Sequence, residues 1–340
     1  MSILVTGGAG FIAFNVVESL LGSGREVVLL DRNPLPAVMQ SAVEQYSKSL
    51  TIEQADILDK AALSGIFARH RIEGVIHCAV ITSGPQREAR DPENVVDVNL
   101  KGSINVLSAV RDAKNKVKRL VYSSSAAAYG ETRYRMPVSE TSAAVPDTLY
   151  AITKFAAERM CLRLGELWGV DVVCARLGSS MGPWERTTGA RDFLGTHTQL
   201  ALCAATGKQA ILPRETTSVD WIYSRDTAAG LIALLDAPAV GDTMYNLSSG
   251  WDWTGSLISW CSQLKTIYDN FDYRIADGGH APTISNIDAR NRYPMEVTRI
   301  KRALSFKPRQ PEAARADFLE WIARTPDFWK LNVASTGRAE

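Results

Sequence analysis

The amino-acid sequence predicts an α/β fold with a doubly wound parallel sheet and a smaller, mixed C-terminal lobe. Short apolar segments alternate with helical patterns from the N-terminus to about residue 177. Segments such as 27–30 lack the polar alternation of strands with one solvated face, which is typical of strands covered on both sides. Beyond residue 178, Pro, Gly and Trp interrupt this rhythm. The 340 residues suffice for two domains, or for one large α/β unit with an appended lobe.

Each element of this alternation follows from its own residues. Apolar segments predict strands at 2–6, 27–30, 50–54, 74–79, 119–123 and 171–177. Apolar periodicity predicts helices at 11–21, 61–70, 94–112 and 149–168. Thr148 is a candidate N-cap for the last of these. In the C-terminal lobe, helices are expected at 198–206, 224–236, 256–264 and 311–324.

The composition argues against several classes of function. Lys and Arg total 38 against 37 Asp and Glu, so the formal net charge of +1 lacks the basic excess of a dedicated nucleic-acid binder. No apolar segment approaches the ~20 residues that span a bilayer, and the N-terminus lacks the basic region of a secretory signal. We therefore expect a cytoplasmic protein that binds a small molecule, with no nucleic acid and no membrane.

The cysteines and histidines indicate neither a disulfide nor a metal site. The five cysteines include no C-x-x-C pair, and the four histidines are scattered without ligand spacing. We expect reduced thiols and no bound metal.

A glycine-rich loop at residues 7–10 (GGAG) joins the first strand to the first helix. Small residues permit a tight turn and close approach to a pyrophosphate, and the helix N-terminus supplies amide donors. Asp31 follows Gly10 by 21 residues, the offset of an acid that binds ribose hydroxyls. Its charge favours NAD over NADP, although Arg32 could soften that preference. The alternative is a tight βα turn followed by a surface acid.

A candidate catalytic group lies near the start of the helix at 149–168. Tyr150 and Lys154 are spaced i, i+4, which places the phenol and the ammonium on one face. An ammonium nearby would lower the pKa of the phenol and favour proton transfer. The serine run 123–125 ends a predicted strand and could hold a substrate oxygen in the same crevice. Tyr150 would then take the proton of that oxygen while nicotinamide takes a hydride.

These features together resemble the extended short-chain dehydrogenase/reductase family, in its NAD-dependent epimerase/dehydratase branch. The matching segments are TGGAGFIA (6–13), DR (31–32), DI (56–57), HCA (77–79), VNLKG (98–102), VYSSSAAAYG (121–130), YAITK (150–154), RLGSSMGP (176–183), VDWIYSRDTA (219–228), YNLSSG (245–250) and FKPR (306–309). The resemblance implies a Rossmann fold, with an NAD-binding domain at 1–177. It makes 178–340 mainly a substrate-binding lobe with elements that return to the core.

The resemblance also implies roles for individual residues. It makes Ser125, Tyr150 and Lys154 the catalytic triad. The residues expected at the cofactor are Gly7, Gly10, Phe11, Ile12, Asp31, Arg32, Asp56, Ile57, Ala79, Asn99, Ser123, Tyr150 and Lys154. For Asp56, a helix N-cap is an equal alternative, and for Asn99 the alternative is a helix-interior residue satisfied by backbone. The residues expected at the substrate are Thr82, Ser83, Ser124, Ser125, Ser179, Trp184, Arg186 and Arg191.

Three departures from the family pattern bear on the substrate. Family dehydratases carry Thr-Asp-Glu where this chain has residues 125–127 (SAA), which disfavours sugar dehydration. Nucleotide-sugar 4-epimerases usually have an asparagine in place of Ser179 and a diphosphate-binding arginine in place of Val219. Both differences weaken a nucleotide-sugar substrate. Arg290 or Arg292 could substitute for the missing charge, but a solvated basic face is the favoured interpretation of these two arginines.

The segment 182–192 (GPWERTTGARD) follows the sixth strand and is expected to border the substrate crevice. Trp184 could form an apolar wall, and Arg186 or Arg191 could bind a carboxylate. The alternative is a loop stabilised by its own ion pairs. A small sugar or sugar acid is therefore the expected substrate.

Three functions are compatible with these residues. The leading hypothesis is an NAD-dependent dehydrogenase that oxidises a secondary alcohol of a small sugar, polyol or hydroxy acid. The alternative is an NAD-dependent sugar epimerase that retains its cofactor and passes through a transient ketone. The third is an inactive NAD-sensing scaffold, which the intact Tyr150 and Lys154 argue against. The resemblance further implies a homodimer formed through the helices at 94–112 and 149–168.

Overall fold

A computed structural model describes residues 1–213, 220–277, 279–284, 292–329 and 331 of the chain. Its centre is a seven-stranded parallel sheet in the order β10-β6-β5-β4-β1-β2-β3. The strands are β1 (Ser2–Thr6), β2 (Glu26–Asp31), β3 (Leu50–Gln54), β4 (Ile72–His77), β5 (Arg119–Ser125), β6 (Val172–Leu177) and β10 (Met244–Leu247). The chain reverses its direction across the sheet between β1 and β4, which creates a crevice at their carboxyl ends.

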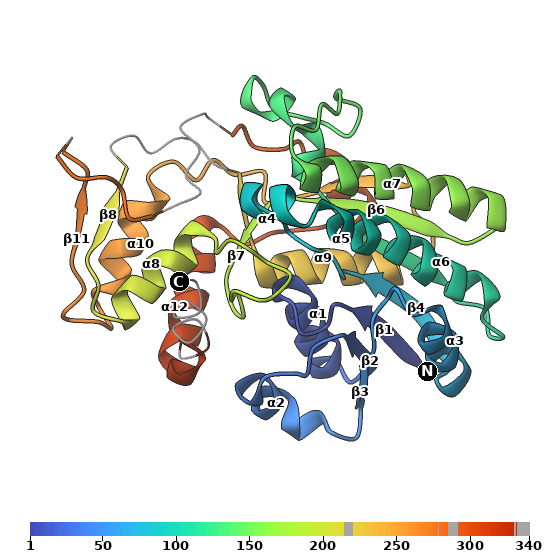
Figure 1. Ribbon diagram of the computed structural model, residues 1–340. Coiled ribbons are helices and arrows are strands. Elements are labelled where there is room, and N and C mark those ends of the chain that lie inside the picture. The colour runs from blue at the N-terminus through green and yellow to red at the C-terminus, as the bar shows by residue number, and fades with distance from the viewer. Residues whose placement is uncertain (214–219, 278, 285–291, 330, 332–340) are drawn as a thin grey trace.

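Helices cover both faces of the sheet (Figure 1). One face carries α1 (Phe11–Gly22) and α9 (Ser224–Asp236), and the other carries α3 (Lys60–Arg69), α6 (Ser103–Asp112) and α7 (Leu149–Trp168). Alternate residues of β1 pack against the helices on opposite faces of the sheet. Ile3 and Val5 join the α1–α9 core, while Leu4 joins the α3–α6–α7 core. This double burial explains the unbroken apolar strand segments of the sequence.

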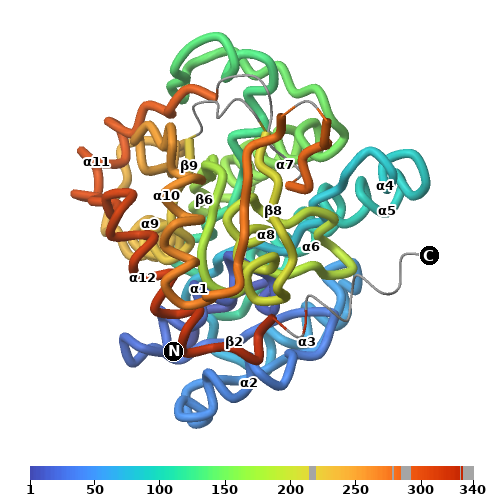
Figure 2. The backbone as a smooth tube through the Cα atoms, turned by 90° about the vertical axis from the view of Figure 1, so that its left-hand side faces the viewer, coloured from blue at the N-terminus to red at the C-terminus, as the bar shows by residue number. Residues whose placement is uncertain are grey.

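The C-terminal lobe lies beyond the carboxyl ends of the strands, at the left of Figure 1 and facing the viewer in Figure 2. It contains two small parallel sheets, which pair β8 (Ala210–Leu212) with β11 (Tyr273–Ile275) and β7 (Ser179–Met181) with β9 (Trp221–Tyr223). Around them lie α8 (Thr196–Ala205), α10 (Ser256–Leu264), α11 (Thr298–Leu304) and α12 (Pro311–Arg324).

The structure confirms most predicted elements and differs from the prediction at several others. The helices at 149–168, 224–236, 256–264 and 311–324 have the predicted bounds. The single helix expected at 94–112 is instead α5 (Pro92–Val96), a π-helical segment (Asp97–Gly102) and α6. The sequence analysis missed α4 (Pro85–Arg90) and missed that β10 joins the main sheet beside β6. A four-residue apolar strand carries too little periodicity to reveal its sheet.

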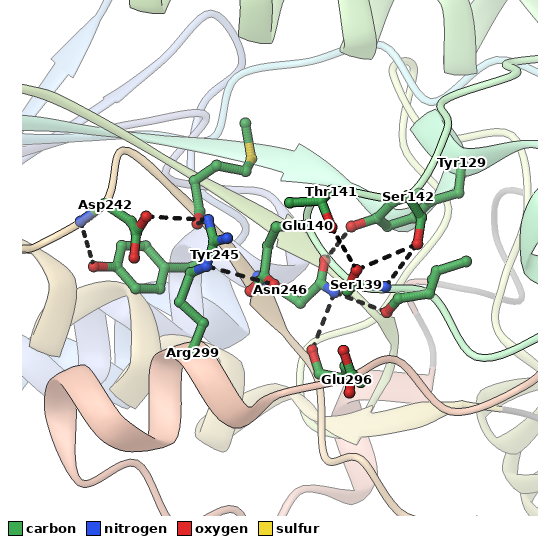
Figure 3. Close-up of polar contacts among 12 residues, drawn as sticks. Tyr129, Ser139, Glu140, Thr141, Ser142, Asp242, Tyr245, Asn246, Glu296 and Arg299 are labelled. Atoms are coloured by element: carbon green, nitrogen blue, oxygen red, sulfur yellow. Dashed lines mark hydrogen bonds and ion pairs between the residues drawn. The ribbon is translucent and has the colours of Figure 1, made fainter.

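A polar junction ties β10 to the segment that follows β5 (Figure 3). The Asn246 side chain accepts a hydrogen bond from the Tyr129 hydroxyl at 2.6 Å and donates to the carbonyls of Val138 and Glu296, each at 3.1 Å. The Glu140 carboxylate accepts a hydrogen bond from the backbone amide of Asn246 at 2.8 Å. This junction fixes the loop that leads from the serine run towards α7.

In the described parts of the chain, no helix is long and apolar enough to cross a membrane. The five cysteines are all free thiols.

Candidate active site

One cavity of about 690 Å³ opens at the carboxyl ends of the central strands. Every residue that the sequence placed at the cofactor or the substrate lines it, except Asn99 and Trp184. The loops after β1, β2, β3 and β4 form what we call the glycine-loop half. The opposite end is the arginine half, lined by Arg133, Tyr134, Ser179, Trp221 and Arg292. Tyr150 lies in the same cavity.

The glycine loop has the geometry of a dinucleotide cradle. Gly7 adopts a left-handed φ of 69°, and a Cβ there would lie 2.8 Å from the backbone of Ala79. The Ala9 amide donates to the Asp31 carboxylate at 3.1 Å, which holds that acid beside the loop. Among the described residues, no side chain caps the N-terminus of α1 and its first turn contains no acid. The loop, the acid and the open helix end fit an adenosine diphosphate moiety.

Asp56 and Asn99, which the sequence placed at the cofactor, form hydrogen bonds to backbone groups. Asp56 accepts a hydrogen bond from the Leu58 amide at 2.9 Å, whereas Asp59 is the N-cap of α3, so Asp56 is not the cap. Asn99 is buried in the π-helical segment and bonds both backbone groups of Ile81, accepting at 2.8 Å and donating at 3.1 Å. Asn99 therefore positions the loop after β4 rather than lining the cavity.

The side chains of Ser125 and Thr82 lie beside the Tyr150 hydroxyl, where hydrogen bonding to them favours the phenolate. Thr148 caps α7 by accepting from the Ala151 amide at 3.1 Å, as the sequence indicated, and this fixes the first turn that carries Tyr150. Burial raises the pKa of Tyr150. The hydrogen bonds from Ser125 and Thr82 and the charges of Arg191 and Arg133 act in the opposite direction. The lowered pKa expected from the sequence is therefore wrong for this structure, because burial dominates.

Lys154 lines the cavity and is 2% exposed. Its ammonium donates to the carbonyl of Ser123 and lies 4.3 Å from the centre of the Tyr122 ring. Burial lowers the pKa of Lys154 to about 8. The ammonium is thus fixed by backbone and by an aromatic face.

The arginine half gathers two cations from distant parts of the chain. The guanidinium carbon of Arg133 lies 5.0 Å from the centre of the Tyr134 ring, and that of Arg292 lies 6.0 Å from it. Arg292 also donates to the Ser179 hydroxyl at 3.3 Å. Sequence analysis missed Arg133 and Tyr134. The only feature that could have indicated them is their position shortly after the AAAYG segment (126–130).

The buried carboxyl of Asp220 lies behind these cations. Burial raises its pKa to about 7, and the charges of Arg133 and Arg292 act in the opposite direction. Ser248 donates to Asp220 at 2.6 Å, so this carboxyl is held in place. The residues Val219 and Arg290, which the sequence analysis weighed for a diphosphate, lie outside the described residues. Arg292, the other substitute considered there, does line the cavity.

The structure corrects the role expected for Trp184. Its indole is 2% exposed, donates to Glu18 of α1 at 2.5 Å and packs edge-on against Phe14, Trp321 and Phe328. A side chain enclosed in this way forms part of the core and no wall for a substrate. Its spacing in the sequence could not show this, because its partners come from both ends of the chain.

The two arginines of the same segment face different surroundings. Arg191 forms an ion pair with the buried Glu185, and its guanidinium lies 5.4 Å from the centre of the Phe11 ring. Arg186 donates to the carbonyl of Ala9 in the glycine loop at 3.1 Å. The sequence suggested that either could bind a substrate carboxylate, but the structure places Arg186 in the glycine-loop half.

The serine and threonine hydroxyls that the sequence placed at the substrate also face different partners. Thr82 faces Tyr150. Ser83 donates to Glu88 at 3.1 Å, and Ser124 donates at 2.8 Å to Glu158, which is buried and paired with Arg176. Ser83 and Ser124 therefore donate to internal carboxylates, while Ser125 and Thr82 face Tyr150.

The comparisons with known proteins define the class of the molecule. Residues 3–248 match the NAD dependent epimerase/dehydratase family, and the chain belongs to that family. It is an NAD-dependent enzyme of the extended short-chain dehydrogenase/reductase type.

Among particular relatives, the chain is 34% identical to the UDP-glucose 4-epimerase of Lacticaseibacillus casei over 52% of this chain and 50% of that protein. It is 25% identical to a dTDP-glucose 4,6-dehydratase of Shigella flexneri over 98% of this chain and 96% of the other. The matches with the first curated relatives, both UDP-glucose 4-epimerases, span about half the length of each of those proteins. The structure of UDP-glucose 4-epimerase from Thermus thermophilus in complex with NAD superposes with a TM-score of 0.75 at 25% identity, covering 97% of this chain and 99% of that one.

Proposed function

We propose that the protein is an NAD-dependent sugar epimerase whose substrate carries a dianionic group, a nucleoside diphosphate being the first candidate. The pair of guanidinium groups around Tyr134, which lines the same cavity as Asp31, carries this proposal. Two cations match the two charges of a diphosphate, and each can form charge-assisted hydrogen bonds to it. The relatives named UDP-glucose 4-epimerase support the same reaction class. They favour epimerisation over the dehydrogenase preferred from the sequence.

The residues of the chain divide the work. Tyr150 takes the proton of a secondary hydroxyl and later returns it, while Ser125 and Thr82 hold the phenol oxygen in place. Bound NAD supplies the reversible oxidation of the carbon that bears this hydroxyl. Lys154 keeps a positive charge in the cavity, so a transient phenolate would be stabilised. Arg133 and Arg292 would retain the anionic end while the sugar presents its other face to Tyr150.

A direct assay tests this proposal. The purified protein is incubated with UDP-glucose, UDP-galactose, UDP-glucuronate and dTDP-glucose without added NAD, and the sugars are resolved by NMR. We expect one of them to convert to its epimer, and the Tyr150→Phe variant to form none. Absence of epimer, together with NADH formation from sugar acids when NAD is added, would contradict the epimerase.

An NAD-dependent dehydrogenase of a small sugar acid is the second candidate. It is favoured by Ser179, which lines the arginine half and whose hydroxyl already accepts a hydrogen bond from Arg292. Arg292 would then bind one carboxylate. Calorimetry with UDP and dTDP separates the two candidates, because only the epimerase of a nucleotide sugar should bind either at micromolar concentration.

We further propose a homodimer that forms through α5, α6 and α7. These helices lie side by side on one face of the molecule (Figure 1), and Arg111 of α6 lies over the Trp168 ring of α7 at 4.4 Å. Val96, Ile152 and Leu167 expose apolar side chains there. Light scattering at micromolar protein is expected to show a dimer, and a purely monomeric mass would contradict it.

A further inference from the structure

The segment 182–195, which we call the strap, crosses from α1 to the loop after β4. At its start, Asn15 of α1 donates to the carbonyl of Pro183 at 3.0 Å. At its far end, the Thr82 amide donates to the carbonyl of Ala190 at 2.7 Å, and the Asp192 amide donates to the carbonyl of Thr82 at 3.2 Å. The strap is thus fixed on both sides of the glycine loop.

Asp192 strengthens the second attachment. Its carboxylate accepts from the Gly84 amide at 3.0 Å and forms a bidentate ion pair with Arg87 of α4 at 2.5 to 2.9 Å. The middle of the strap, with Arg186, Thr188, Ala190 and Arg191, lines the cavity. The strap therefore forms a preformed wall of the cavity that touches the glycine loop, through the hydrogen bond from Arg186 to the Ala9 carbonyl.

Arg186 is the cation of the strap that lacks an acidic partner. Within the described part of the chain, no carboxylate lies within ion-pair distance of it, whereas Arg191 has Glu185. The Arg186 Nε is buried and has no hydrogen-bond partner among the described groups. Burial lowers the pKa of its guanidinium, and the Asp31 carboxylate acts in the opposite direction. Burying a cation in this way is unfavourable in free energy unless an anion pairs with it.

We propose that Arg186 binds the adenosine-side phosphate of NAD, opposite the N-terminus of α1. The guanidinium is bonded to the Ala9 carbonyl, within the same loop that the pyrophosphate must approach. A guanidinium suits phosphate because its planar fork donates two parallel hydrogen bonds. The phosphate would therefore lie between the amides of α1 and a cation supplied by the C-terminal half of the chain. This inference depends on the NAD cofactor and holds for an epimerase and a dehydrogenase alike.

The test compares ligands that contain the phosphate with one that lacks it. The full-length protein is freed of bound nucleotide, and the binding of NAD, ADP and adenosine is measured by calorimetry. For Arg186→Gln we expect the Kd of NAD and of ADP to rise about tenfold or more, with the Kd of adenosine within threefold of wild type. NAD that copurifies with the variant should fall in parallel.

Arg90→Gln is the matched control. It removes an equal charge from α4, near Asp192 of the strap, but from an exposed side chain that does not line the cavity and whose charge is screened by solvent. We expect it to change the Kd of ADP by less than threefold. Equal effects of the two variants would overturn the proposal, because the loss of any positive charge near the cavity would then explain both results. An Arg186→Gln protein with wild-type affinity for ADP would overturn it too.

Arg186→Lys covers the case in which the glutamine variant does not fold. It keeps the charge and loses the fork, so ADP should bind several-fold more weakly than in wild type while adenosine binding is unchanged. Equal weakening of ADP and adenosine would show a role in the shape of the loop only and would contradict the phosphate contact.

Discussion

The two halves of the cavity are assembled in different ways. The glycine-loop half consists of backbone turns that follow successive strands, and its main acid, Asp31, is held by the amide of Ala9. The arginine half consists of side chains from separate loops, with Arg133 and Arg292 meeting around Tyr134. Backbone turns recognise what all dinucleotides share, whereas side chains on loops can change without disturbing the sheet. The cofactor is therefore a property of the fold, and the substrate is a property of a few side chains.

The largest expected effect comes from the residue that the two halves share. Tyr150→Phe should lower turnover by ~10²–10⁴-fold, because it removes the group that transfers the proton. The amount of NAD that copurifies should not change, since the ring still fills its place. Initial rates and released nucleotide are measured on the same preparation. A variant within threefold of wild-type turnover would remove Tyr150 from the mechanism.

The next effect sharpens the role of the arginine half. Arg292→Ala and Arg133→Ala should each raise the KM for an anionic substrate well over tenfold, because each leaves a phosphate or carboxylate charge unpaired. A neutral analogue should show a smaller change, and NAD retention should be unaffected. If either variant retained much less NAD and also showed a higher KM for the substrate, the division of the cavity into a cofactor half and a substrate half would be wrong.

A moderate effect is expected at the other end of the cavity. Asp31→Ser removes the carboxylate that would bind the ribose hydroxyls and repel a 2′-phosphate, so NAD should bind about tenfold more weakly. Use of NADP should rise at the same time. Calorimetry with both dinucleotides measures this, and the KM for the sugar serves as the control. A wild-type protein that already uses NADP as well as NAD would show that Arg32 has overridden Asp31.

The smallest effect is a pH dependence of stability at Lys154. Its pKa is lowered from 10.5 to about 8, so between these values the folded protein binds fewer protons than the unfolded chain. The contribution of this group to the free energy of unfolding should therefore rise with pH across that window. Urea unfolding at about pH 7.5 and pH 9.5 should show a gain in wild type, relative to Lys154→Met, at the higher pH. An unchanged difference between the two proteins would contradict the lowered pKa.

The sequence by itself determined the cofactor and the alternation of strands and helices in the first half of the chain. Residues 7–10, Asp31 and the Tyr150–Lys154 spacing are local signals, because a βα turn and one helical turn fix their geometry within a few residues. Thr148 as the cap of α7 is of the same kind. Most strands of the first half follow from apolar segments whose burial on both faces is visible in the composition, whereas the edge strand β3 is largely exposed.

The tertiary structure decided what the segment 182–195 does. From the sequence, Trp184 is a candidate for an apolar wall of the substrate crevice, and Arg186 and Arg191 are equal candidates for binding a substrate carboxylate. Their partners are Glu18, Ala9 and Glu185, so one packs into the core, one reaches the glycine loop and one is paired within its own segment. The meeting of Arg133 with Arg292 was likewise decided by folding, because contacts between residues this far apart depend on how the lobe packs on the sheet rather than on any local pattern.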